Sequence, residues 1–154
     1  MTVTVGQPVP DFSMPVTGGG SVSLSGLKGR KVILYFYPKD DTSGCTKEAC
    51  GFRDALPDFR GADAEVIGVS RDSIASHEKF KAKYELPFAL ASDTDGSVSE
   101  LFGTWVEKSM YGRKYMGMER ATFLIDADGV LRGEWRKVKV PGHVEAVLAA
   151  AKSL

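Results

Sequence analysis

The chain has 154 residues, of which 43% are hydrophobic and 26% are charged, and its 20 basic residues balance its 20 acidic ones. These proportions are ordinary for a soluble globular protein, and the balanced charge offers no long-range attraction for nucleic acid or an anionic membrane. No apolar run has the length of a membrane span, and the first residues lack the pattern of a secretion signal. We therefore expect a single cytoplasmic domain over residues 1–154 that acts on a small, neutral or weakly charged substrate.

The expected elements begin with an N-terminal β-hairpin. Prolines and a glycine triplet surround two short alternating stretches at 12–14 and 21–24, a pattern typical of a small hairpin. A turn-rich connector at 25–30 leads into an apolar run at 32–37, which predicts a buried central strand. A helix is expected to follow over 45–60, with Pro57 near its end.

The rest of the chain alternates between strand and helix patterns. We expect a strand at 65–70, a helix at 73–84, a strand at 88–91, a short helix at 97–102, a strand pair at 121–126 and 130–135, and a final helix after Pro141-Gly142. Residues 103–119 are aromatic and basic without a clear period, so we expect a long loop with some extended character there. This order predicts a three-layer α/β domain.

Both cysteines lie in the segment 35–54, YFYPKDDTSGCTKEACGFRD. Cys45 stands where a polar loop gives way to the expected helix, and unpaired N–H groups and the helix dipole favour a thiolate there. A free cysteine is more often a small buried hydrophobe, but this junction, the polar neighbours and the second cysteine favour a reactive Cys45. Asp41, Thr42 and Ser43 are candidate helix caps, and Glu48 could reach back towards the helix start.

Cys50 follows five residues later in the same expected helix. An α-helix places the two Cα atoms about 8.6 Å apart, whereas a disulfide needs about 7 Å or less. A bond between them therefore requires the first turns to unwind, which indicates a switching pair. Gly51 would ease that unwinding. Alternatively, Gly51 only permits close packing against the sheet.

Other chemistry finds little support in the sequence. His77 and His143 have no partner at metal-ligand spacing, no C-x-x-C-H offers a haem site, and no glycine-rich phosphate loop follows a strand. We therefore expect no metal, haem or nucleotide cofactor.

The segment 36–54 resembles the active-site signature of the peroxiredoxins, because PKDDTSGC fits the pattern Pro-x-x-x-Thr-x-x-Cys. The cysteine spacing is similar to that of the atypical two-cysteine Q group, also called bacterioferritin comigratory proteins. Two further stretches, WVEKSMYGRKYMGMERATFLIDADG and KVKVPGHVEAVL, extend the resemblance over most of the chain. It implies a thioredoxin-like three-layer α/β domain with a central mixed β-sheet flanked by helices and an N-terminal β-hairpin.

The resemblance also implies a peroxidatic Cys45, a resolving Cys50 and a substrate pocket completed by Pro38, Thr42 and Arg120. The Thr42 hydroxyl would turn towards the sulfur or the substrate, although it could serve only as a helix cap. Pro38 would shield the sulfur, or simply end the strand.

Arg120 would favour the thiolate and polarise the peroxide, although an arginine beside a strand is usually a solvated surface residue. Arg53 could assist or be an ordinary helix-face charge, and we leave it out of the site. Ser43 stands where the family often has proline, which should alter loop stiffness more than chemistry.

The implied function is a thiol-dependent peroxidase that reduces hydrogen peroxide and organic hydroperoxides in antioxidant defence. A Cys45 sulfenic acid would be resolved by Cys50 as an intramolecular disulfide, and thioredoxin or glutaredoxin would reduce that bond. Turnover within one helix needs no second subunit, so we expect a monomer, although the aromatic segment at 105–115 could be a dimer surface. The alternatives are a thiol–disulfide oxidoreductase, which usually has C-x-x-C rather than this C-x₄-C, and a non-enzymatic peroxide sensor.

Overall fold

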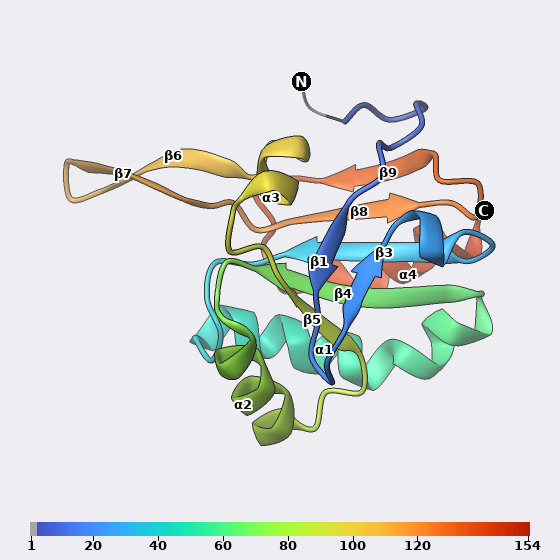
Figure 1. The fold of residues 1–154 in the computed structure, drawn as a ribbon, viewed down its shortest axis with the longest axis horizontal. Helices are drawn as coiled ribbons and strands as arrows, with labels where there is room; N and C mark the ends of the chain where they lie inside the picture. The colour runs from blue at the N-terminus through green and yellow to red at the C-terminus, as the bar shows by residue number, and fades with distance from the viewer. Residues whose placement is uncertain (1–2) are drawn as a thin grey trace.

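The computed structural model describes residues 3–154, and a five-stranded mixed sheet forms its centre (Figure 1). In spatial order the strands are β5 (Ala89–Ser92), β4 (Ala64–Ser70), β3 (Lys31–Phe36), β8 (Ala121–Ile125) and β9 (Leu131–Trp135). The first three strands run parallel, and β8 and β9 are each antiparallel to the preceding strand in this order. The mixed sheet expected from the sequence is confirmed.

Strand β3 can occupy the centre of the sheet because both of its faces are apolar. Residues 32–36 of this strand are all buried, as are all five residues of β8 beside it. Side chains alternate between the two faces of a strand, so such runs supply two separate cores. Ile33 and Tyr35 belong to one core, whereas Val32, Leu34 and Phe36 belong to the other.

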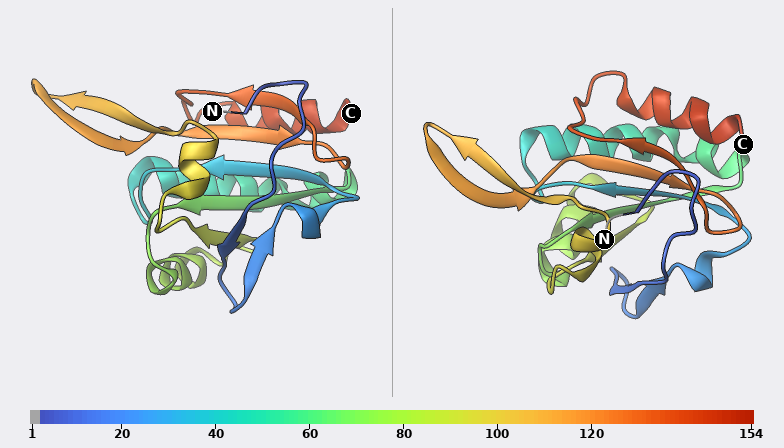
Figure 2. Two further views of the ribbon diagram at one scale, coloured as in Figure 1. Left: turned by 45° about the horizontal axis from the view of Figure 1, so that its top comes forward. Right: turned by 90° about the horizontal axis from the view of Figure 1, so that it is seen from above.

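Helices and the N-terminal hairpin cover these two faces, which gives the expected three layers. The helices are α1 (Ser43–Gly61), α2 (Ile74–Tyr84), α3 (Ser97–Leu101) and α4 (His143–Lys152). Figure 2 shows α1 and α4 side by side on one face of the sheet. Strands β1 (Ser13–Pro15) and β2 (Ser21–Ser23), with the short 3₁₀ helix η1 (Ser25–Leu27), pack with α3 on the other face.

The helix that carries both cysteines is continuous from Ser43 to Gly61. It starts two residues before the expected position and continues past Pro57, which lies inside it. At Gly51 an added Cβ would lie 3.0 Å from Val144 Cγ2, so the glycine allows α4 to approach α1 closely. Close packing at Gly51 is therefore against α4 and not against the sheet.

The long loop expected at 103–119 is wrong, but the extended character expected there is confirmed. Residues Trp105–Met110 form β6 and Arg113–Met118 form β7, an antiparallel hairpin that projects from the body of the molecule in Figure 1. Tyr111 and Gly112 both have positive φ, as a type I′ turn requires. Most side chains near the tip are solvent-exposed on both faces, so the sequence there lacks the apolar alternation that marks a half-buried strand.

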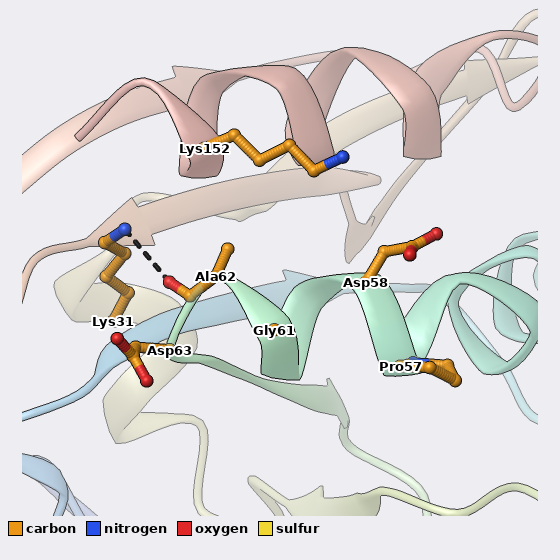
Figure 3. Close-up of a pocket in the computed structure, with 7 residues that line it drawn as sticks. All are labelled: Lys31, Pro57, Asp58, Gly61, Ala62, Asp63 and Lys152. Carbon is orange, nitrogen blue, oxygen red and sulfur yellow. Dashed lines mark hydrogen bonds between the residues drawn. The ribbon is translucent and has the colours of Figure 1, made fainter.

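The far end of α1 borders an open hollow of about 470 Å³ (Figure 3). It lies between the C-terminal ends of α1 and α4, where Lys31 Nζ donates hydrogen bonds to the carbonyls of Ala62 and Ala151, each at 3.0 Å. Cys45 lies in the first turn at the opposite end of the helix. Over residues 3–154, no helix is long and apolar enough to cross a membrane.

Candidate active site

Cys45 is the third residue of α1, and it is buried with only 2% of its surface exposed. The Thr46 N–H donates to the Thr42 carbonyl at 2.8 Å, so the N–H groups of residues 43–45 precede the helical hydrogen-bond ladder. Cys45 therefore lies in the first turn, at the positive end of the helix dipole. The junction predicted from the sequence therefore exists. The packing interpretation is only partly right, because the buried thiol belongs to the apolar core but also contacts Arg120.

Arg120 reaches this sulfur from the sheet. It precedes β8, whose first residue, Ala121, pairs with Phe36 at the end of β3, where the chain leaves for the Cys45 loop. Arg120 Nη2 lies 3.2 Å from Cys45 Sγ, and Nη1 donates to Glu48 Oε1 at 2.7 Å. One guanidinium thus bridges the thiol and a carboxyl group, and the alternative of a solvated surface arginine is wrong.

Gly44 makes room for that guanidinium, a role that sequence reasoning missed. An added Cβ at Gly44 would lie 3.1 Å from Arg120 Nη2. The Ser-Gly-Cys order is visible in the sequence. The close approach of Arg120, 76 positions later, to Gly44 is not.

Glu48 has a different partner from the one expected from the sequence. It does not reach back to the helix start, because its side chain is fully buried and accepts a hydrogen bond from Arg120. Burial raises the pKa of Glu48 to about 7, although the Arg120 charge acts in the opposite direction. Its Oε2 faces His143 Nε2 at 3.9 Å, and that nitrogen lies 2.8 Å from Thr122 Oγ1.

Thr42 and Pro38 flank the site without a described hydrogen bond to the sulfur. Thr42 occupies the N-cap position of α1, but its hydroxyl donates to the Lys39 carbonyl at 3.0 Å and makes no capping bond. Pro38 follows the end of β3 and is exposed. Their roles towards the sulfur or a substrate remain predictions.

Asp40 fastens the loop between β3 and α1 to the protein interior. Its Oδ1 accepts a hydrogen bond from Tyr37 at 2.6 Å, and its Oδ2 contacts Ser76 Oγ and His77 Nδ1, each at 2.7 Å. Burial would raise the pKa of Asp40, but the hydrogen bonds from His77 and Tyr37 outweigh it and hold the pKa below its usual value. His77, isolated in the sequence, therefore has a partner in space.

Asp40, Asp72 and His77 place ligand-type atoms within 4.8 Å of one another. These atoms already serve the loop: Asp72 Oδ2 accepts the Asp40 N–H at 2.8 Å, and His77 Nε2 lies 2.9 Å from the Ala91 carbonyl. Asp41 adds a second anchor through Lys83 Nζ at 2.7 Å, and its backbone has φ 57. The acidic pair in KDDTSG thus holds the loop in place.

Cys50 is partly buried, and both cysteines are free thiols. It shares the unbroken α1 with Cys45, which confirms that one helix spans the two. The Arg53 guanidinium is bonded to Asp54 and to the Tyr84 carbonyl, and its charge interacts with Cys50. Leaving Arg53 out of the Cys45 site agrees with this placement.

A buried thiol at a helix N-terminus, hydrogen-bonded to an arginine and followed by a second cysteine, defines a thiol-dependent redox enzyme on a thioredoxin-like fold. The match to the AhpC/TSA family covers residues 5–134. The chain belongs to this family, and within it to the peroxiredoxins of the Q or bacterioferritin comigratory group.

Three relatives illustrate this membership. A putative peroxiredoxin Bcp of Coxiella burnetii is 55% identical over 148 residues, which is 96% of this chain and 98% of the relative. The bacterioferritin comigratory protein of Xanthomonas campestris has a solved structure with a TM-score of 0.89 and 44% identity, over 92% of this chain and 90% of that one. A cysteine-to-serine variant of Xylella fastidiosa PrxQ gives a TM-score of 0.93 at 38% identity, over 99% and 98% of the two chains.

Proposed function

We propose that this peroxiredoxin reduces hydrogen peroxide and organic hydroperoxides by forming a sulfenic acid on Cys45. The observation that carries the proposal is the 3.2 Å contact between Arg120 Nη2 and Cys45 Sγ in the first turn of α1. The Xanthomonas campestris relative was described for alkyl peroxide reduction, which supports the same substrate class here.

The proposed step is a nucleophilic displacement at oxygen. The Cys45 thiolate attacks the terminal peroxide oxygen, the S–O bond forms while the O–O bond breaks, and negative charge moves to the departing oxygen. The Arg120 guanidinium is a fixed donor beside the sulfur, and the N–H groups at the start of α1 would supply further donors for the developing charge. Thr42 and Pro38 complete the pocket in this proposal, with the Thr42 hydroxyl leaving Lys39 for the substrate.

Cys50 is the proposed resolving residue. It attacks the Cys45 sulfenic acid, water leaves, and an intramolecular disulfide forms. Since the helix separates the two Cα atoms by about 8.6 Å, this step requires local unwinding of α1. Thioredoxin, or glutaredoxin in its place, would then reduce the bond, and the single domain over residues 1–154 would act as a cytoplasmic monomer without nucleic-acid or membrane partners.

Separate replacement of the two cysteines tests this assignment. Cys45→Ser should lose peroxidase activity, whereas Cys50→Ser should react once and stall as a sulfenic acid. Intact-mass spectra after one equivalent of peroxide would show the added oxygen only where Cys45 remains. An added oxygen in Cys45→Ser and none in Cys50→Ser would reverse the roles.

Turnover with thioredoxin, its reductase and NADPH separates the peroxidase from its alternatives. Catalytic peroxide consumption supports the proposal. Stoichiometric oxidation without turnover would indicate a sensor, and insulin reduction without peroxide turnover would indicate a thiol–disulfide oxidoreductase.

A further inference from the structure

Glu48 has a feature that the proposed peroxide chemistry does not explain. Its side chain is fully buried, and Oε2 has no hydrogen-bond partner among residues 3–154, while Oε1 is bonded to Arg120. An ionised carboxylate with a buried, unpaired oxygen is strongly disfavoured, whereas a protonated one needs fewer hydrogen-bond donors. The geometry therefore favours a neutral Glu48.

His143 strengthens this preference from α4. Its Nε2 faces Glu48 Oε2 at 3.9 Å and lies 2.8 Å from Thr122 Oγ1. When Thr122 donates its hydroxyl proton to Nε2, the single lone pair of that nitrogen is engaged by Thr122, and the nitrogen carries no proton that it could donate to Glu48. Burial and the Arg120 charge lower the pKa of His143 to about 4, so His143 is neutral near neutral pH.

Among the ionisable groups around Glu48, Arg120 is the cation that Glu48 shares with Cys45. Tyr35 on β3 is neutral, because burial and the nearby Glu48 raise its pKa well above the usual value. Lys108 on β6 interacts electrostatically with Arg120 and Cys45, and the exposed Glu145 of α4 interacts electrostatically with His143. Arg120 is thus the buried cation in contact with both Glu48 and Cys45.

We propose that Glu48 holds a proton while Cys45 is a thiolate and gives it up when that sulfur is oxidised, and that His143 and Thr122 are positioning residues that keep Glu48 protonated. With Glu48 neutral, the whole Arg120 charge stabilises the thiolate. Once the sulfur has become an uncharged sulfenic acid, the same charge stabilises the Glu48 carboxylate instead. This inference rests on the proposed oxidation of Cys45 by peroxide.

The oxidation step balances in protons without any other acid. Thiolate, Glu48 carboxylic acid and hydroperoxide give sulfenic acid, Glu48 carboxylate and alcohol. The sulfur is oxidised, the peroxide is reduced, and the departing alkoxide becomes neutral at the expense of the Glu48 proton. The alcohol can receive its proton through solvent, since Glu48 itself is buried.

Proton uptake during one turnover tests the proposal in a Cys50→Ser background, where the reaction stops at the sulfenic acid. A pH indicator in weak buffer at about pH 6.5 would report protons taken up, with the thiolate content measured by its ultraviolet absorbance. With Glu48→Gln added, we expect about one proton per thiolate oxidised. With Glu48 present, uptake should fall well below that value, and equal uptake in the two proteins would overturn the proposal.

An infrared difference spectrum gives a readout that needs no change at Glu48. Peroxide should abolish the C=O band of a protonated carboxylic acid in the Cys50→Ser protein. If that band persists after oxidation, the proposal is overturned. Intact mass on the same samples identifies a different failure: a protein without the added oxygen has not been oxidised, and then the proposed function fails.

Thr122→Val tests the positioning residues. Without the Thr122 hydroxyl, His143 can carry its proton on Nε2 and donate it to Glu48, so Glu48 should ionise at lower pH. Proton uptake at about pH 6.5 should then rise towards the Glu48→Gln value. Glu145→Gln, which removes an exposed carboxylate in the first turn of α4, is the matched control and should behave as its parent. Unchanged uptake in Thr122→Val would remove Thr122 and His143 from the proposal.

Discussion

At the residue scale, Arg120 is central to the proposed chemistry, because two of its nitrogens contact different acids. Nη2 faces the Cys45 sulfur at 3.2 Å and Nη1 faces Glu48 at 2.7 Å. A lysine could present one charge but could not bridge both partners with a rigid planar group. The proposed chemistry therefore favours arginine over lysine at this position.

Arg120→Ala should slow the reaction with peroxide on the order of a hundredfold, which corresponds to ~2.7 kcal/mol of lost stabilisation. The pH at which iodoacetamide alkylation of Cys45 reaches half its maximal rate should also move upward, and Arg120→Lys should recover only part of both effects. Arg132→Ala is the control, since it removes an arginine whose ion pair with Asp126 is at the surface. An unchanged alkylation profile and rate in Arg120→Ala would place this residue outside the site.

Gly44→Ala should separate stability from activity. Alanine favours a helix over glycine by about 1 kcal/mol, so the variant should unfold at a higher denaturant concentration. Its Cβ would lie 3.1 Å from Arg120 Nη2, and displacement of the guanidinium should slow the peroxide reaction by up to about tenfold.

Gly61→Ala is the matched control for this change, because it lies in the same helix with open space around its Cβ. It should gain stability at full activity. Full activity in Gly44→Ala would show that the guanidinium needs no space there.

The sequence predicts those candidate site residues whose signals are local. Helix position and spacing indicate Cys45 and Cys50, whereas Arg120 follows from resemblance to a family motif. Glu48 was misplaced because its three-residue spacing from Cys45 fits a capping pattern, whereas its actual partner is Arg120 in another element. Likewise, Asp40 meets His77 and Thr122 meets His143 only through tertiary contacts, which no local pattern encodes.

At the scale of elements, the segments predicted most accurately are the buried ones. The strands at β3, β4 and β8 were predicted within about two residues because their apolar runs are long and both faces are buried. The β6–β7 hairpin was missed because exposed Met110, Tyr111, Tyr115 and Met116 interrupt any one-sided pattern. Helix α1 was predicted correctly, and its continuity across both cysteines has a testable consequence.

Oxidation to the Cys45–Cys50 disulfide should unfold the first turns of α1. A helix holds the two Cα atoms about 8.6 Å apart, beyond the disulfide limit of about 7 Å. Amide exchange over residues 43–55 should therefore be slow in the reduced protein and much faster in the oxidised one, while β3 and β4 change little. Peroxide-treated Cys50→Ser, which cannot form the bond, should keep its protection, and equal protection with the disulfide confirmed by mass would contradict the prediction.

At the scale of the whole molecule, the site depends on the junction of three elements. Helix α1 contributes Glu48, the sheet contributes Arg120 and Thr122, and α4 contributes His143. Burying these groups together couples folding to protonation. The pKa of Glu48 is raised and that of His143 is lowered, so the two groups make stability depend on pH with opposite slopes.

Burial raises the pKa of Glu48 from 4.5 to about 7, so the folded state binds its proton more tightly than the unfolded state. Its contribution to stability is complete below pH 4.5 and is lost as the pH rises through 7. The free energy of unfolding of reduced Glu48→Gln, minus that of the parent, should therefore grow over this window, by up to about 3 kcal/mol. Denaturant titrations at several pH values measure it, and a constant difference would contradict a buried, proton-binding Glu48.

His143 should give the opposite trend. Its pKa falls from 6.5 to about 4, so the unfolded state binds its proton more tightly, and its contribution is present above pH 6.5 and lost as the pH falls through 4. The stability of His143→Asn relative to the parent should therefore rise as the pH is lowered across this window, whereas that of Glu145→Gln, an exposed group on the same helix, should vary little. Because the two windows overlap, the parent should show a nearly flat contribution from this pair, and only the single variants reveal the opposing slopes. A His143→Asn difference that tracked the Glu48→Gln difference in sign would show that the two groups titrate as one unit rather than as the separately perturbed acid and base described by the structure.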